Sequence, residues 1–206
     1  MDQLTPMLPH DLLRLNPGAA AWLPAGAPAW AARALCDVPW VVVRRAEVPA
    51  ARIAVGIRGA DRSHRLAWTI PPGLAADTVA PQSLAAVNPA REVPALGALP
   101  AVRAIFGDLR WGPTGSVGFE LATGVPAATV TSDLDVVVRP AGEPSASPGR
   151  LRDVYEQLKS LPVRVDCQVE TRSGAVALAE LISDRDEVLV RTPHGPRLAL
   201  RSTVTW

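Results

Sequence analysis

The sequence has little cysteine, little net charge and no long apolar run. Its two cysteines, Cys36 and Cys167, are too few for a disulfide framework and fit a reducing cytoplasm. The formal net charge is +1, so the chain lacks the basic field that binds nucleic acid or an anionic membrane. No apolar run approaches the ~20 residues of a transmembrane helix. We therefore expect a cytoplasmic protein with no nucleic-acid partner and no membrane partner.

Proline and glycine are plentiful, with 21 and 15 residues, which indicates many turns. The hydrophobic content of 48% is typical of a globular protein, and apolar segments recur along the whole chain. A length of 206 residues allows one large domain or two small ones. Residues 71–92 are rich in Pro and Ala and suit an irregular connection, so we expect two domains, 1–92 and 93–206.

The first domain is predicted to contain a small sheet. Apolar and β-branched residues at 40–43, 52–59 and 64–70 predict three strands of an antiparallel meander. A helix is expected from Pro28 to Cys36, with proline near its first turn. Asp11 to Leu15 suits a short helix or turn, and another short helix is expected at 83–87.

The second domain combines predicted helices with predicted strands. An apolar stripe from Pro94 to Phe106 predicts a helix that Pro100 should kink or split. Ser147 and Pro148 suit the N-cap and first position of another helix. Further expected elements are a strand and turn at 118–124, a surface loop at 140–149, a strand at 162–171, a short helix at 176–182, and a hairpin formed by 187–192 and 197–202.

Three acids occur where they can share one site. Asp133 and Asp135 lead into the β-branched run 136–138 and project from one face of a strand, with backbones roughly 6.7 Å apart. Asp166 lies on the polar face of the alternating segment 162–171, whose other face, with Cys167, should be buried. If these strands pair, the carboxylates can converge on one or two Mg²⁺ ions, which favour oxygen ligands. Alone, an Asp-x-Asp pattern is most often a solvated strand end.

The order of these motifs carries a family resemblance. Gly115-Ser116, the Asp133-x-Asp135 pair and the later Asp166 resemble the nucleotidyltransferase superfamily that includes DNA polymerase beta. Longer strings narrow the match: WGPTGSVGFELATG at 111–124, SDLD at 132–135 and the looser PHDLL at 9–13 are similar to the phosphoribosyl-dephospho-CoA transferases. That family is also called the malonate decarboxylase holo-acyl-carrier-protein synthases. Sixteen residues separate Ser116 from Asp133, more than the usual superfamily spacer.

The resemblance implies an α+β fold. A small mixed-sheet N-terminal domain, which binds substrate or partner, would precede a polymerase-beta-like nucleotidyltransferase domain. The implied reaction transfers the phosphoribosyl-dephospho-CoA group from triphosphoribosyl-dephospho-CoA to a serine of the apo acyl-carrier subunit of malonate decarboxylase, releasing pyrophosphate. Asp133 and Asp135 would be catalytic and, with Asp166, would hold Mg²⁺ or Mn²⁺. Gly115 and Ser116 would bind the leaving pyrophosphate.

The donor of that reaction carries a triphosphate and a further pyrophosphate, so cationic partners are expected. Six arginines fall within residues 44–65: Arg44, Arg45, Arg52, Arg58, Arg62 and Arg65. Arg58 is the candidate for donor binding, because Gly56 and Gly59 flank it and glycine allows close approach of a ligand. For any single arginine, a solvated sheet face is the plainer interpretation. Two other functions stay open: a nucleotidyltransferase acting on a small molecule or an RNA end, and a catalytically inactive binding module of the same fold.

Overall fold

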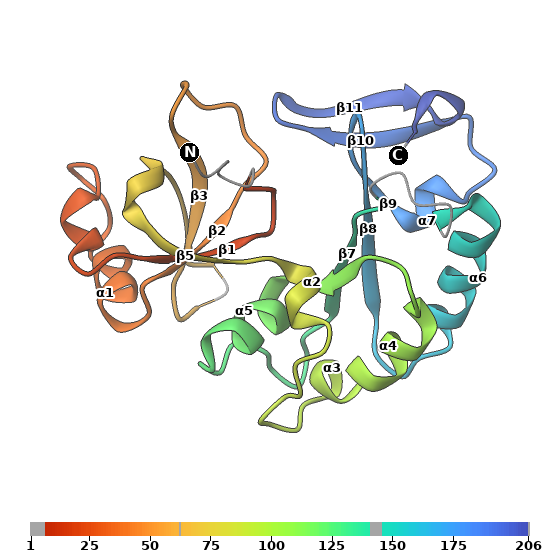
Figure 1. Cartoon of the computed structure of the whole chain (residues 1–206), viewed down its shortest axis with the longest axis horizontal. Helices are drawn as coiled ribbons and strands as arrows, with labels where there is room; N and C mark the ends of the chain where they lie inside the picture. Colours follow the sequence, from red (N-terminus) through yellow and green to blue (C-terminus); the bar gives the residue numbers. More distant parts are fainter. Residues whose placement is uncertain (1–6, 62, 141–145, 206) are drawn as a thin grey trace. The chain divides into compact units, whose positions relative to one another are not determined.

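The computed structural model describes residues 7–61, 63–140 and 146–205, and the chain divides into two compact units, Met1–Ala80 and Pro81–Trp206 (Figure 1). Each unit has its own sheet and its own buried core, and the expected α+β class is confirmed. Arg62 and residues 141–145 of the expected surface loop lie outside the described residues. Within the described ranges, no helix combines the length and apolar character needed to cross a bilayer.

The first unit is built on a five-stranded sheet in the order β4-β3-β2-β1-β5. Its elements are β1 Leu12–Leu15, η1 Ala19–Trp22, α1 Ala29–Asp37, β2 Trp40–Val43, β3 Ile53–Arg58, β4 Arg65–Ile70, η2 Pro72–Leu74 and β5 Ala75–Val79. The predicted helix and three-strand meander are confirmed. The expected mixed sheet is wrong, because every neighbouring pair is antiparallel. Short loops join β2 to β3 and β3 to β4, and such loops can link only antiparallel neighbours.

Two strands of this sheet differ from the sequence-based expectation. The segment from Asp11 to Leu15, predicted as a helix or turn, contains β1 (Leu12–Leu15), which lies between β2 and β5. Leu12, Leu13 and Leu15 are buried, so strand pairing on both sides overrides the local preference. The other strand, β5, lies in the segment expected to be irregular. Its sequence AADTV has no alternating apolar face, and its pairing with β1 is a contact between distant parts of the sequence.

The second unit contains a six-stranded mixed sheet in the order β11-β10-β9-β8-β7-β6. Its strands are β6 Trp111–Pro113, β7 Leu134–Val138, β8 Val165–Thr171, β9 Gly174–Ala177, β10 Glu187–Thr192 and β11 Gly195–Leu200. Its helices are α2 Pro81–Leu84, α3 Pro94–Gly97, α4 Leu99–Phe106, α5 Gly115–Thr123, α6 Pro148–Lys159, α7 Leu178–Leu181 and η4 Arg201–Thr203. The hairpin of β10 and β11 and the split between α3 and α4 are confirmed. The expected helix at 176–182 is shorter, because β9 occupies its first residues.

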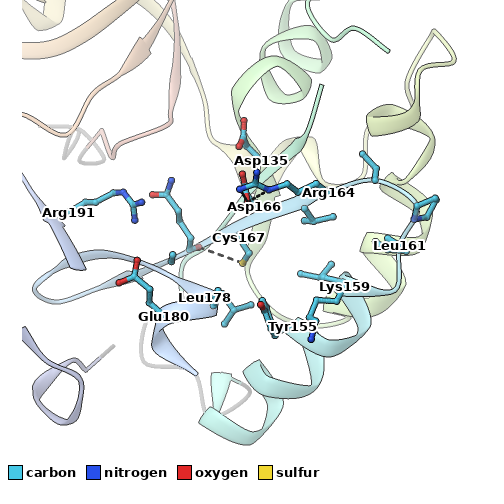
Figure 2. A pocket seen from close by; sticks show the side chains of 17 residues that line it. Asp135, Tyr155, Lys159, Leu161, Arg164, Asp166, Cys167, Leu178, Glu180 and Arg191 are labelled. Atoms are coloured by element: carbon cyan, nitrogen blue, oxygen red, sulfur yellow. Dashed lines mark hydrogen bonds and ion pairs between the residues drawn. The ribbon is translucent and has the colours of Figure 1, made fainter. Parts of the chain in front are cut away.

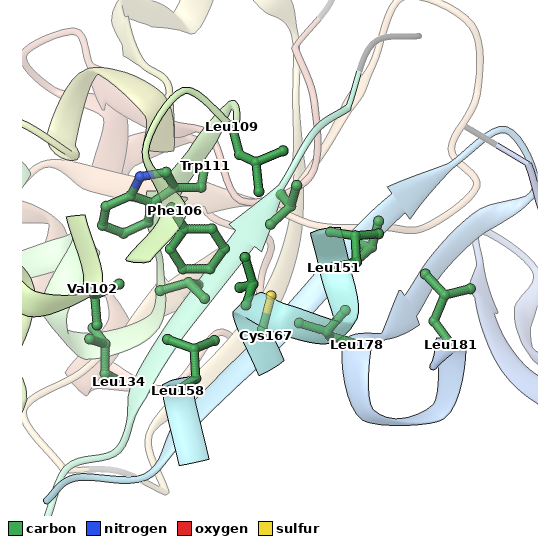
Figure 3. Close-up of a cluster of buried hydrophobic side chains, with 14 of the residues drawn as sticks. Val102, Phe106, Leu109, Trp111, Leu134, Leu151, Leu158, Cys167, Leu178 and Leu181 are labelled. Atoms are coloured by element: carbon green, nitrogen blue, oxygen red, sulfur yellow. The ribbon is translucent and has the colours of Figure 1, made fainter. Parts of the chain in front are cut away.

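The parallel pair β7–β8, joined through α6, places the functional side chains. Ser147 caps α6, its Oγ accepting the Arg150 N–H at 3.3 Å, as the sequence predicts. Figure 3 shows Leu151 and Leu158 of α6 among the buried side chains beside Cys167. Burial raises the pKa of the Cys167 thiol. The predicted inward face of β8 is therefore confirmed, and its opposite face is left for polar residues.

The strand and turn expected at 118–124 are wrong, because these residues belong to α5. Gly118 allows close packing of this helix, because a Cβ on it would lie 2.5 Å from the Pro113 carbonyl oxygen. Gly124 then ends the helix in the left-handed region, with φ +72°, and its N–H donates to the Glu120 carbonyl. Gly118 thus serves α5 by packing, and Gly124 by capping it.

The unit boundary lies between Ala80 and Pro81 rather than at the predicted residue 92. Helix α2 packs directly on β6, and a Cβ on Gly112 would lie 2.0 Å from the Pro81 carbonyl group. Farther along the same segment, Arg91 forms an ion pair with Glu120 of α5. These contacts attach residues 81–92 to the second core.

Candidate active site

The register of β7 and β8 brings two of the predicted acids together. Asp135 and Asp166 are directly opposite each other in this parallel pair, and such partners share a face of the sheet. Asp133 precedes β7 and lies two residues before Asp135. Glu170, the other acid on the polar face of β8, lies four residues farther along and pairs with β9 instead. The register therefore brings Asp135 and Asp166 together, places Asp133 two residues before Asp135, and leaves Glu170 aside.

Arg164, directly before β8, lies beside these acids, although the sequence analysis assigned it no role in the site. Its Nε and a terminal guanidinium nitrogen lie 3.1 and 3.0 Å from Asp166 Oδ1. The pKa of Arg164 is raised by the hydrogen bond to Asp166, by the charge of Asp166, and then by the charges of Asp133 and Asp135. One guanidinium thus lies in the field of three carboxylates, and Figure 2 shows it beside Asp135 and Asp166. Both side chains of the pair are exposed, so its effect on stability is small.

Gly115 and Ser116 begin α5 directly against Asp135. The Thr114 N–H donates to the Asp135 carbonyl oxygen at 2.8 Å, which fixes the start of the helix to β7. Gly115 has φ +61°, and a Cβ there would lie 2.1 Å from Asp135 Oδ2. Only glycine satisfies both the conformation and the contact. The first backbone N–H to bond back within α5 is that of Gly118, to Thr114 O at 2.9 Å. The N–H groups before it form the kind of helix N-terminus that binds phosphate.

An ion pair between Arg91 and the buried Glu120 restrains the chain that leads from α5 to Asp133. Arg91 donates to both oxygens of Glu120 at 2.8 Å, and the N–H groups of Ala127 and Ala128 donate to Glu120 Oε2 at 2.8 and 2.9 Å. These bonds, with that from Arg91 first, lower the pKa of Glu120 to about 2 against the opposing effect of burial. The long spacer between Ser116 and Asp133 is therefore an anchored segment, which sequence spacing alone does not reveal.

The acids meet the requirements of a metal ion only in part. In residues 7–61, 63–140 and 146–205, no three His, Cys, Asp or Glu side chains form a complete metal-binding group. Mg²⁺ rarely needs one, since it commonly binds one or two carboxylates together with substrate phosphates and water. Asp135 and Asp166, side by side beneath the N-terminus of α5, supply such a carboxylate pair. The residues present therefore fit a Mg²⁺ ion that arrives with a polyphosphate.

Arg58 belongs to the first unit, at the end of β3, where it is opposite Arg65. The structure does not support the idea that the flanking glycines, Gly56 and Gly59, leave room for a ligand beside Arg58. A Cβ on Gly59 would lie 2.6 Å from His64 Cβ and 2.9 Å from the Trp30 ring, and one on Gly56 would lie 3.2 Å from the Arg44 side chain. Neighbouring side chains therefore already occupy the space that these glycines leave. A role for Arg58 in donor binding stays a prediction.

Comparison with known proteins gives a consistent result over residues 8–202. Two family models match: "Phosphoribosyl-dephospho-CoA transferase MdcG N-terminal domain" over residues 8–81 and the corresponding C-terminal domain over residues 81–202. A phosphoribosyl-dephospho-CoA transferase of Pseudomonas putida is 42% identical over 192 residues, 92% of each chain. Enzymes of the same name from Pseudomonas aeruginosa and Klebsiella pneumoniae are 41% and 38% identical, covering 92% of this chain and 90% and 93% of theirs. No solved structure matches the chain.

Proposed function

Since the chain belongs to the phosphoribosyl-dephospho-CoA transferase family, we propose that it loads the acyl-carrier subunit of malonate decarboxylase with its prosthetic group. The donor is triphosphoribosyl-dephospho-CoA, and the acceptor is a serine of the apo carrier. The serine oxygen forms a bond to the α-phosphorus of the triphosphate, and the bond from that phosphorus to the β-phosphate oxygen breaks. The serine loses its proton, and pyrophosphate leaves.

The observation that carries this proposal is the contact between Gly115 and the carboxylate of Asp135, opposite Asp166. It joins an anion-binding helix end to a carboxylate pair, and phosphoryl transfer needs both. The N-terminus of α5, with the Ser116 hydroxyl, binds the departing pyrophosphate. Asp166 accepts the proton of the incoming serine; both hydrogen bonds from Arg164 go to its Oδ1. The same arrangement supports a polymerase-beta-like nucleotidyltransferase fold for the second unit.

The proposed cofactor is Mg²⁺, which Mn²⁺ can replace. Asp135 and Asp166 would hold it together with the donor phosphates, and Asp133 is the proposed third ligand. A bound divalent ion offsets the negative charge that develops on the attacking and leaving oxygens. The near-neutral charge of the chain gives no support to an RNA acceptor.

Mass spectrometry of the carrier tests the proposal. The apo carrier subunit is incubated with the protein, Mg²⁺ and triphosphoribosyl-dephospho-CoA. We expect the carrier to gain one phosphoribosyl-dephospho-CoA group on serine, with equimolar pyrophosphate released. Asp135→Asn is the matched control, and it should fold normally and leave the carrier unmodified. Labelling of an RNA end or a small hydroxyl compound in place of the carrier would favour another nucleotidyltransferase. No transfer to any acceptor, and no Mg²⁺ binding by calorimetry, would favour the inactive binding module.

A further inference from the structure

A cavity of about 690 Å³ adjoins the acids in the second unit. It opens where the sheet is incomplete: β9 pairs with β8 only from Gln168 onward, and at Ala177 the chain turns into α7. The first half of β8, from Val165 to Cys167, therefore has an edge that β9 does not cover. The C-terminal turn of α6, the loop at 161–164 and the start of α7 enclose this space. Its volume is within the range of small-molecule sites.

The polar side chains of the cavity stand on different sides of it. Figure 2 shows Arg164, Asp135 and Asp166 together at one end, and Arg191 and Glu180 at another side. The guanidinium of Arg164 is already paired with Asp166. A third cation, Lys159, lies 3.2 Å from a Glu156 carboxylate oxygen and 5.4 Å from the centre of the Tyr155 ring. Two of the three cations therefore have partners on the protein.

Arg191 of β10 is the exception. It is half-buried, and its Nη1 is buried without a hydrogen-bond partner in the described part of the chain. Glu180 lies on the same side of the cavity, but among the described residues no ion pair joins it to Arg191, and its Oε2 accepts the Leu189 N–H at 2.7 Å. A buried donor without a partner costs about 1–3 kcal/mol, more when the group is charged. A half-buried guanidinium with an unpaired nitrogen therefore points to an anionic ligand that binds beside it.

The sheet register relates Arg191 to the acids. Arg191 is opposite Ala175, and Ala175 is opposite Glu170, four residues beyond Asp166 on β8. Partners in antiparallel strands share a face, so Arg191 and Asp166 project from the same side of the sheet. Four residues along β8 and two strand spacings across the sheet put their Cα atoms roughly 16 Å apart. The long arginine side chain shortens the gap that a ligand must bridge.

We propose that this cavity binds the dephospho-CoA part of the donor, with Arg191 contacting its diphosphate bridge. The inference rests on the proposed function, which places the triphosphate at Asp135 and the start of α5. The donor carries a second phosphate group, the diphosphate of dephospho-CoA, separated from the triphosphate by two ribose rings. A cation away from the acids but on the same sheet face suits this group, and a guanidinium binds phosphate through paired hydrogen bonds. The serine-bearing segment of the carrier would not need such a cation.

Calorimetric binding of 3′-dephospho-CoA, which lacks the triphosphate and cannot react, tests this site directly. We expect the wild-type protein to bind it and Arg191→Gln to bind it about 10- to 100-fold more weakly, the loss expected for hydrogen bonds to a charged group. Arg191→Lys should restore part of the affinity. Arg197→Gln is the matched control, since Arg197 is exposed on the neighbouring strand of the same hairpin and does not line the cavity. In the transfer assay, Arg191→Gln should raise the KM for the donor about 10-fold or more and change kcat little.

Several outcomes separate this inference from the proposed function. Normal carrier loading by the wild type without detectable dephospho-CoA binding would overturn the site and leave the function intact. Dephospho-CoA binding that depends on Arg191, without carrier loading, would support the site and contradict the function. Equal losses in Arg191→Gln and Arg197→Gln, or a raised KM for the carrier alone, would also overturn the site. If circular dichroism shows that Arg191→Gln does not fold, the test rests on dephospho-CoA binding by the wild type and by Arg191→Lys. Lack of binding by the wild type, or full wild-type affinity in Arg191→Lys, would then overturn the site.

Discussion

Replacing Gly115 with alanine separates the backbone conformation of this residue from its contact with Asp135. Gly115 has φ +61° at the start of α5, and Gly124 has φ +72° at its end. A Cβ on Gly115 would meet Asp135 Oδ2 at 2.1 Å, whereas one on Gly124 would meet nothing within 4 Å. Gly124→Ala is therefore a matched control, with the same backbone strain in the same helix but without the collision.

The two alanine variants should lose similar stability. A left-handed backbone costs about 1–2 kcal/mol for a residue with a Cβ, and the stiffer unfolded chain returns about 0.4–1 kcal/mol of this. We therefore expect each variant to be destabilised by about 1 kcal/mol. The collision in Gly115→Ala adds little, because the atom that must give way is the end of a side chain. The carboxylate has to move by about 1 Å to reach van der Waals contact, and such a displacement can cost about 100-fold in rate, or about 2.7 kcal/mol.

Urea unfolding and carrier loading measure the two effects separately. Gly115→Ala and Gly124→Ala should show similar free energies of unfolding, and only Gly115→Ala should lose about 100-fold in kcat/KM. A Gly115→Ala variant with the wild-type rate would show that Asp135 need not occupy its observed position. Equal losses of rate in both variants would show that α5 as a whole, and not the contact, limits the reaction.

Three further predictions concern Asp166, Arg58 and Glu120. Asp166→Ala should lose most of its carrier-loading activity, while Glu170→Ala should lose little, because Glu170 lies about 13 Å farther along β8. If the steady-state rate falls more in Glu170→Ala than in Asp166→Ala, Glu170 is the third acid. Arg58→Ala should raise the KM for the donor more than the KM for the carrier, and Arg58→Lys should restore part of the loss. An unchanged KM for the donor would show that Arg58 is only a solvated strand residue. The pKa of Glu120 falls from 4.5 to about 2, so its stabilising effect is present above pH 4.5 and is lost as the pH falls through about 2. That shift corresponds to about 3 kcal/mol. In urea unfolding, the free energies of unfolding of the wild type and Glu120→Gln should therefore differ by about this much at pH 7 and converge toward pH 2. A difference that does not change with pH would contradict the charge-based explanation.

The sequence predicted those parts of the site that depend on local patterns. Alternation in 162–171 gave the two faces of β8, with Cys167 buried and Asp166 on the polar side. The β-branched run after Asp135 gave β7. In each case the period of the side chains is set by the strand itself, so the pattern and the structure share one cause.

Pairings between distant segments were not predictable from the same patterns. Whether Asp166 lies opposite Asp135 depends on the parallel register of β7 and β8, and a shift by one residue would turn Asp166 to the other face. The strand β5 exists only because it pairs with β1. The helix at 118–124 was missed for a related reason: Gly118 packs against the Pro113 carbonyl, a contact that the local sequence pattern does not show.

The long spacer before Asp133 shows how such a distant contact can serve the site. A segment of sixteen residues could leave the first acid on a loose loop. Instead, Glu120 projects from α5, the helix that begins at Gly115, and binds Arg91 together with the Ala127 and Ala128 N–H groups. The N-terminus of α5 is fixed to β7 at one end of the spacer, and a side chain of the same helix restrains the spacer farther along, at Ala127 and Ala128. The anion-binding turn and the carboxylates are therefore held by one helix, and the length of the spacer need not loosen the site.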